Sequence, residues 1–320
     1  MSGEMAQEGM TPATLDLQVH GRPLAAVLRG HAAWLEHRPE GIRADLSGLS
    51  LAGIGLPRVN LRRARLNATI WLEADLSGAD FAGAELEGAD FRGSTLSGAD
   101  FTAAALTRAS FGEALADSAN FSEAILREAS FRRAILRQSR FLDCTLNRCD
   151  FMGARASGAS FHQTHILECL FNQAELIEAS FYHARVQAGH FSGALASGAN
   201  FSTAALSACE FNAAELDRAR FYAADLSRSR FTRASLLECD LREARLAGAE
   251  FGQAELAGSR FSGARLFAAD LRGANLTSAR ELTAEQLAQA RTSESTTLPN
   301  GSLGPYIKNS GAERPRFPRD

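Results

Sequence analysis

Residues 79–111 read ADFAGAELEGADFRGSTLSGADFTAAALTRASF, and this stretch decides the fold. A large apolar residue returns at every fifth position, and a small residue, usually alanine, lies two positions before each large one. This period matches neither the 3.6 residues of an α-helical turn nor the continuous alternation of a long strand. The large residues, which we expect to form the structural core, are Phe81, Leu86, Phe91, Leu96, Phe101, Leu106 and Phe111.

The same register continues without insertion or deletion from Ala44 to Leu276. Of the twenty positions spaced by ten from Phe81 to Leu271, eighteen are phenylalanine. Of the twenty-four positions spaced by ten from Leu46 to Leu276, nineteen are leucine. Most of this 320-residue chain is therefore one short structural unit repeated many times.

Each five-residue repeat suits a short extended segment followed by a turn. Residues two apart point to the same side of an extended segment, so the small and the large residue can both face inward. The two remaining residues, often Ser-Gly or Arg-Gly, suit a turn that redirects the chain. Repetition predicts a solenoid with the apolar pair inside. Ala116, Ala156 and Ala196 replace leucine at intervals of forty residues. They predict either small voids in the core or a local narrowing of it, and the narrowing is the simpler result.

Three segments resemble a known consensus: ADLSGADF at 74–81, GADFRG at 88–93 and RGANLTSA at 272–279. They are similar to the A(D/N)LXX consensus of the pentapeptide-repeat family. The resemblance covers residues 44–280. It implies an all-β solenoid, a right-handed quadrilateral β-helix of about twelve coils with four repeats per coil, and residues twenty apart would stack. Short capping helices at both termini complete this prediction.

The two ends of the chain carry signals for these caps, because a β-helix leaves strand edges open at its ends. Residues 23–38 have the apolar spacing of an amphipathic helix, in which Trp34 and Leu35 would cover the first coil. Thr283 and Gln286 form a capping-box pattern, and Leu287 would pack on the last coil. The predicted segments are a flexible lead-in (1–22), an N-terminal capping helix (23–43), the repeat β-helix (44–280), a C-terminal capping helix and strand (281–302) and a weakly ordered tail (303–320).

Composition places few constraints on function. The net charge of −3 gives no strong field toward nucleic acids or anionic membranes. The first ten residues have neither a basic start nor an apolar run, and no segment has the roughly 20 apolar residues of a membrane span. We therefore expect a cytoplasmic protein without a membrane span, with export by a route that needs no such signal as the alternative. A bacterial source is what the family resemblance implies.

The residues that could ligate metals or react do not form a motif. All five cysteines occupy the small inward position two before a large residue, which predicts buried thiols. His162, His165, His183 and His190 cluster in outward positions. We interpret them as exposed polar residues, with a shallow metal or anion site as the alternative, and we expect no cofactor and no metal site.

Charges are uneven along the chain. Seven acids and one arginine lie between Glu73 and Asp100, whereas seven arginines lie between Arg127 and Arg155. Aliphatic residues take outward positions near these arginines, and that mixture is typical of a protein-binding surface. The alternative is that a long solenoid tolerates scattered apolar residues on its surface. The candidate partner surface is Leu115, Ile125, Arg127, Arg132, Arg133, Ile135, Arg137, Arg140, Leu142 and Arg148.

No catalytic motif is present, and a core filled by phenylalanine and leucine leaves no substrate cavity. The sequence therefore predicts a non-enzymatic protein interaction scaffold with an unidentified protein partner. The family resemblance implies two alternatives: a DNA-mimicking binder of DNA gyrase or topoisomerase IV, and a translocated bacterial effector. Members of this family often dimerise through their terminal elements, so the resemblance is compatible with a homodimer and leaves the oligomeric state open. Direct binding of nucleic acid is not expected, because exposed aromatic residues do not alternate with the arginines.

Overall fold

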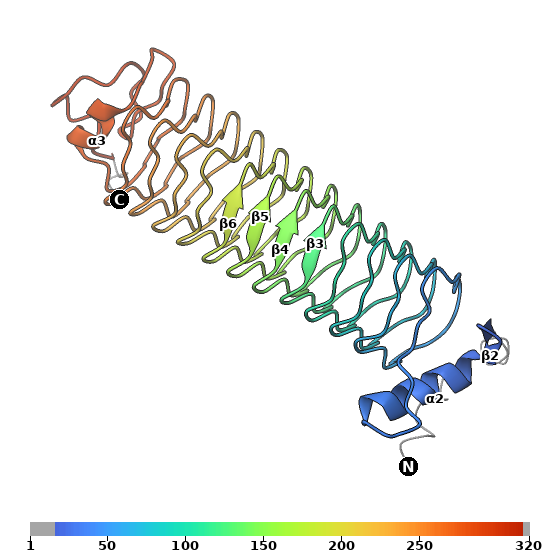
Figure 1. The fold of residues 1–320 in the computed structure, drawn as a ribbon. Coiled ribbons are helices and arrows are strands. Elements are labelled where there is room, and N and C mark those ends of the chain that lie inside the picture. The colour runs from blue at the N-terminus through green and yellow to red at the C-terminus, as the bar shows by residue number, and fades with distance from the viewer. Residues whose placement is uncertain (1–16, 316–320) are drawn as a thin grey trace, which may run out of the picture. The chain divides into compact units, whose positions relative to one another are not determined.

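The computed structural model describes residues 17–315. The chain divides into two compact units, residues 1–155 (unit 1) and 156–320 (unit 2). Both are built from stacked coils, as Figure 1 shows for each unit. No helix among the described residues combines the length and the apolar composition that crossing a bilayer requires.

Parallel bridges between residues twenty apart hold the coils together. In unit 1, Asp80 pairs with Asp100 and Thr95 with Leu115, and in unit 2 Leu195 pairs with Glu215. Such bridges recur every five residues, so each coil has four bridging positions and four faces. Both units are therefore parallel β-helices, whereas the right hand and the count of about twelve coils stay predictions.

Within the described coils, four bridging segments are long enough to be strands. In unit 1, β3 (Ile125–Arg127) pairs in parallel with β4 (Thr145–Asn147). In unit 2, β5 (His165–Leu167) pairs in parallel with β6 (Arg185–Gln187). The central residue of each strand is buried and its first residue is exposed, as the alternation of side chains along a strand requires.

The core of each unit consists of stacked aromatic rings. The seven predicted core residues of residues 79–111 are fully buried. Phe101 stacks on Phe81 at 5.0 Å and on Phe121 at 4.9 Å between ring centroids, and it meets Phe111 edge to face at 5.5 Å. Stacked and edge-to-face contacts are the two favourable arrangements of aromatic pairs. Phenylalanine therefore fills each coil and joins it to the next.

The turns explain why the two outer residues of each repeat are often Arg-Gly or Ser-Gly. Most turns close with a backbone hydrogen bond from residue i+3 to residue i, such as Ala84 N–H to Phe81 O at 2.9 Å. The second turn residue has a positive φ, 65° at Gly93 and 54° at Arg133. Glycine adopts this conformation without strain, whereas a side chain there carries a modest energetic cost.

A short hairpin and a helix precede the first coil of unit 1. β1 (Gln18–Val19) pairs antiparallel with β2 (Arg22–Pro23), and α2 (Leu24–Leu35) follows directly. Within the predicted lead-in, Gln18, Val19 and Arg22 therefore belong to this hairpin. Residues 1–16 lie outside the described residues. The helix buries Leu24, Leu28 and His31, while Trp34 and Leu35 are half-buried.

His31 connects this helix to the first coil. Its ring stacks on Trp34 at 5.6 Å, and its Nδ1 accepts a hydrogen bond of 3.1 Å from the backbone N–H of Ala44. Burial lowers the pKa of His31, and the nearby Arg43 lowers it further. Protonation of Nδ1 would also place two donors against each other, so the folded protein favours the neutral ring.

We therefore expect the protein to lose stability as the pH falls below about 6.5, the ordinary histidine pKa. As the pH falls, the histidine of the unfolded chain is protonated at a higher pH than that of the folded chain. Lowering the pH from about 6.5 toward the folded pKa of His31 therefore favours unfolding. Thermal unfolding followed at pH 8 and at pH 5.5 measures the effect. His31→Gln should reduce the difference between the two midpoints, whereas the same substitution at the exposed His37 should not.

The C-terminal end of unit 2 is closed by α3 (Ala284–Gln289) and the segment after it. Thr283 and Gln286 form a capping box, and the Gln286 side chain also donates to the carbonyl groups of Phe261 and Ala264. Leu287 is buried. Residues 291–303 then add two parallel bridges and one antiparallel bridge, and residues 316–320 lie outside the described residues.

Candidate functional site

The structure separates the ten residues of the candidate partner surface into two groups. In unit 1, the column of bridging residues Thr95, Leu115 and Ile135 forms one face, here called the Leu115 face. Arg132 and Arg133 lie in the turn that precedes this face, and Arg137 lies in the turn that follows it. Five of the ten residues therefore lie together: Leu115, Arg132, Arg133, Ile135 and Arg137.

The other five predicted residues lie on the remaining sides of unit 1. Ile125 and Arg127 belong to β3, which is two bridging positions away from Leu115 and so on the opposite face. Arg148 lies in the turn after that face, in the next coil. The other two are Arg140, in the column of Asp100 and Asn120, and Leu142 in the turn after it.

The centre of the Leu115 face is apolar and partly open to solvent. Leu115 is 41% exposed and forms a bridge with the partly exposed Ile135. Their side chains leave the sheet on the same side, one coil apart, so they form one continuous aliphatic contact area. An apolar pair of this kind, with charged residues around it, has the composition of a small protein-binding surface.

The three arginines around this pair are each held by a carboxylate. Arg137 makes two parallel hydrogen bonds to Asp117, of 3.0 and 2.7 Å, and these bonds hold the pKa of Asp117 below its usual range. Arg132 contacts Asp150 at 2.9 Å, and Arg133 lies 3.7 Å from Glu113. Arg133 has the longest of these contacts and a strongly exposed side chain, so it is the one most available to a partner.

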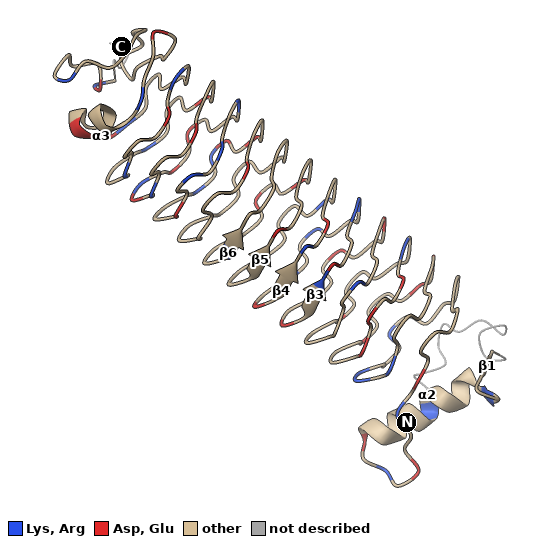
Figure 2. Cartoon of the chain, turned by 45° about the horizontal axis from the view of Figure 1, so that its top comes forward, with Lys and Arg blue, Asp and Glu red and all other residues tan. Residues whose placement is uncertain are grey.

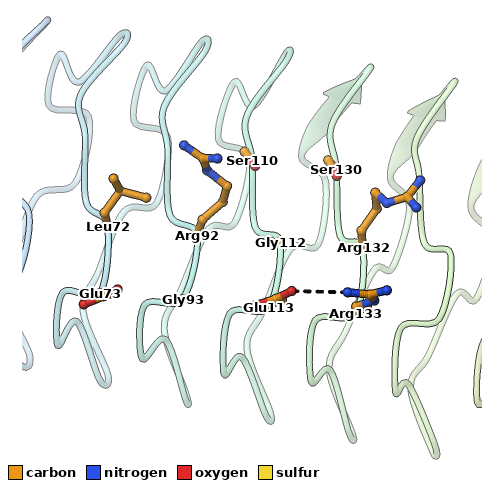
Figure 3. A pocket seen from close by; sticks show the side chains of 10 residues that line it. All are labelled: Leu72, Glu73, Arg92, Gly93, Ser110, Gly112, Glu113, Ser130, Arg132 and Arg133. Carbon is orange, nitrogen blue, oxygen red and sulfur yellow. Dashed lines mark ion pairs between the residues drawn. The ribbon is translucent and has the colours of Figure 1, made fainter.

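A groove of about 580 Å³ follows the turn between the Leu115 face and the preceding face. Figure 3 shows Arg92 and Arg132 on either side of Gly112, with their guanidinium groups turned away from each other. Gly93 and Gly112 contribute no side chains, which leaves the groove open. Its lining residues are Leu72, Glu73, Arg92, Gly93, Ser110, Gly112, Glu113, Ser130, Arg132 and Arg133.

The histidine cluster in unit 2 forms ring contacts and hydrogen bonds. His162 stacks on Tyr182 at 5.2 Å, and His183 lies against the same tyrosine at 4.0 Å. The Nδ1 atom of His190 is 3.0 Å from Glu210 Oε2. Among the described residues, no group of three or more His, Cys, Asp or Glu side chains is placed to hold a metal ion.

The five cysteines are buried in the small inward positions. Cys144 donates from Sγ to the carbonyl oxygen of Phe121 at 2.7 Å, and burial raises its pKa to about 12. Burial also raises the pKa of Cys209 to about 12. Thiols with pKa values this high stay protonated at neutral pH and are poor nucleophiles.

Unit 2 carries a second surface that sequence reasoning missed. Three aliphatic residues on it are exposed by similar fractions: Ile177 (39%), Leu195 (38%) and Leu237 (37%). A groove of about 430 Å³ lies beside them, lined by Ile177, Glu178, Ser197, Gly198, Asp217, Arg218, Leu237 and Glu238. The signal in the sequence is the register, because Ile177 and Leu237 lie sixty residues, or three coils, apart. Figure 2 shows that acidic and basic residues alternate along the ribbon of both units. A charge count along the sequence therefore does not reveal a local surface such as this one.

Comparison with protein families identifies the repeat. A model of pentapeptide repeats (8 copies) matches residues 60–98, 74–112, 94–133, 117–153, 224–263 and 244–280. A model of the pentapeptide repeat region matches residues 164–241, so the two models together match more than half of the chain. The chain belongs to the pentapeptide-repeat family. A comparison of this pentapeptide-repeat protein with curated proteins gives no significant match.

Solved structures of pentapeptide-repeat proteins are similar to this chain. HetL, involved in heterocyst differentiation regulation in the cyanobacterium Nostoc sp. strain PCC 7120, is 26% identical over 87% of this chain and 97% of HetL, with a TM-score of 0.39. A pentapeptide repeat protein of the Arabidopsis thaliana thylakoid lumen is 27% identical over 38% of this chain and 67% of its own, with a TM-score of 0.22. Full-length QnrB1, a plasmid-mediated fluoroquinolone resistance protein, is 23% identical over 68% of this chain and 91% of its own, with a TM-score of 0.23.

Proposed function

We propose that this pentapeptide-repeat protein is a non-enzymatic interaction scaffold and that the Leu115 face of unit 1 binds a protein partner. The observation that carries the proposal is the in-register pairing of Leu115 with Ile135, with arginines in the turns on both sides. The stacked core fixes these positions, so the surface is organised before a partner arrives. A matching partner presents apolar residues surrounded by carboxylates.

The arginines would mainly increase the rate of association and select the partner, and would add little to the binding free energy. Exposed ion pairs add little stability, but complementary charge steers encounter and disfavours partners of like charge. The groove beside Gly112 gives room for a loop of the partner next to the apolar pair. Binding should therefore weaken as salt screens the charges.

Reversal of Arg132, Arg133 and Arg137 to glutamate is expected to abolish capture of the partner without unfolding the protein. All three side chains lie in turns on the outside, so the core is unchanged. Affinity purification from the cell that encodes the protein, followed by mass spectrometry, compares the variant with the original protein. A partner captured equally by both would exclude the Leu115 face.

A matched control is the reversal of Arg62, Arg63 and Arg272. Arg62 contacts an aspartate eighteen residues ahead, as Arg132 does, and Arg63 has a positive φ of 56°, close to the 54° of Arg133. Arg272 makes two hydrogen bonds to one aspartate, as Arg137 does. This control should keep the partner, because it changes the net charge equally on other parts of the surface.

DNA mimicry toward gyrase or topoisomerase IV is the alternative that this family membership raises. It needs a surface dominated by carboxylates, yet the arginines of the Leu115 face would repel a DNA-binding partner. Over residues 44–280 the chain has 27 acidic residues and 25 arginines. Inhibition of gyrase supercoiling by a stoichiometric amount of the protein would favour this alternative, and unchanged supercoiling would favour the scaffold.

A further inference from the structure

The missed surface of unit 2 is organised around one bridging column. Leu195 forms bridges with Glu175 on one side and Glu215 on the other, so an exposed leucine lies between two glutamates. Ile177 and Leu237 lie in the turns that follow this face. The three exposed aliphatic side chains therefore share a face and its adjoining turns, here called the Leu195 surface.

The groove of the Leu195 surface follows these turns across four coils. Ile177, Ser197, Asp217 and Leu237 occupy equivalent positions twenty residues apart. Coils stack at the spacing of hydrogen-bonded strands, about 4.8 Å, so Ile177 and Leu237 are about 14 Å apart. The groove thus has an apolar group at each end and polar groups between them, with Gly198 leaving its middle open.

The charge of the groove is negative. Its lining includes the acids Glu178, Asp217 and Glu238 and a single cation, Arg218. Arg218 contacts Glu238 at 3.1 Å. Asp217 accepts hydrogen bonds from the Ser235 hydroxyl at 2.5 Å and from the Leu237 N–H at 3.1 Å, and both donors are neutral. Two carboxylates of the lining therefore lack a cation within the part of unit 2 that the structure describes, and Glu215 adds a third beside Leu195.

We propose that the Leu195 surface binds an extended basic segment of a protein partner, with the pattern apolar, any residue, basic, any residue, apolar. In an extended chain, alternate side chains point the same way, and four residue steps span about 13 Å. The two apolar side chains would then contact Ile177 and Leu237, while the basic one reaches Asp217. Charge complementarity selects lysine or arginine over acidic residues and repels nucleic acid.

This inference does not depend on the proposed function of the Leu115 face. The Leu195 surface lies in the other unit, has the opposite charge and uses different residues. If the arginine variant still captured the partner, the proposal for the Leu115 face would fail and that for the Leu195 surface would stand. If the peptide did not bind, only the proposal for the Leu195 surface would fail.

Fluorescence anisotropy with a labelled peptide, Lys-Leu-Ser-Lys-Ser-Leu-Lys, tests the proposal on the full-length protein. We expect saturable binding with a dissociation constant below about 1 mM, weakened by added salt. The variant Glu178→Gln with Glu238→Gln should weaken binding about five- to tenfold, because it removes one unpaired carboxylate and leaves Arg218 without its ion-pair partner, as a cation that repels the peptide. Ile177→Ser with Leu237→Ser should weaken it at least as much, and a peptide with glutamate in place of lysine should not bind.

The control variant is Glu123→Gln with Glu128→Gln, which removes two charges from exposed turn positions of unit 1. All four glutamates have positive φ, between 55° and 63°, so the substitutions are matched in backbone conformation. Unchanged binding in this control supports the Leu195 surface. An equal loss in both variants would show that only net charge matters and would overturn the proposal, as would no saturable binding up to about 1 mM or tighter binding of a short DNA duplex than of the peptide.

Discussion

Phe131→Ala is expected to destabilise unit 1 by about 3–5 kcal/mol, the range for truncating a buried phenylalanine. The Phe131 ring is fully buried and stacks on Phe111 at 4.8 Å and on Phe151 at 4.7 Å. It also meets Phe121 and Phe141 edge to face at 5.4 and 5.6 Å. Because four rings contact it, the neighbours cannot all move to fill the space, and a cavity will remain.

Denaturant unfolding followed by circular dichroism gives the size of this effect, and amide hydrogen exchange gives its location. In a repeat protein each coil contacts mainly its neighbours, so exchange should accelerate most in the coils around residue 131. Phe267→Ala is the control, because Phe267 is 68% exposed and its removal should change stability by less than about 0.5 kcal/mol. Equal destabilisation by both variants would contradict a continuous ring stack as the source of stability.

The core could be predicted from sequence because its signal is local and repeated. A small residue followed two positions later by a large one defines an inward-facing pair, and the structure buries both members. The capping box of Thr283 and Gln286 could be predicted for the same reason, because its two residues lie only three positions apart in the sequence. Because the register has no insertions, the inward positions of one repeat predict those of all the others.

The surface could not be predicted in the same way. A window such as residues 127–148 passes once around a twenty-residue coil, so it necessarily places its arginines on every side. For this reason Ile125 and Leu115, only ten residues apart, lie on opposite faces. Residues that share a face are instead twenty apart, as Leu115 and Ile135 are. The Leu195 surface was missed because its aliphatic residues come from three repeats and from both turn and bridging positions.

One inward position departs from the repeat in a way that allows a test of packing. Gly189 occupies the small position where most repeats have alanine, and Val186 occupies the preceding large position. A Cβ atom on Gly189 would lie 2.6 Å from Val186 Cγ1 and 2.9 Å from Phe191 Cε2. Both distances are too short for real contacts, so the consensus alanine does not fit beside this valine.

Gly189→Ala is therefore expected to destabilise unit 2 by about 1–3 kcal/mol, the usual cost of overpacking. Alanine also restricts the unfolded chain, and this effect stabilises the folded protein by only about 0.4–1 kcal/mol. The clash is larger, so the net change in the free energy of unfolding is a loss.

Val186→Leu moves the branch point of the side chain away from the backbone and restores the pairing of leucine with alanine found in other repeats. In that background the alanine should be neutral or stabilising. A double-mutant cycle from denaturant unfolding should then give a coupling energy of about 1–2 kcal/mol. Stabilisation by Gly189→Ala alone would show that the coil expands at this point, and that the branched Val186 is not what excludes the consensus residue.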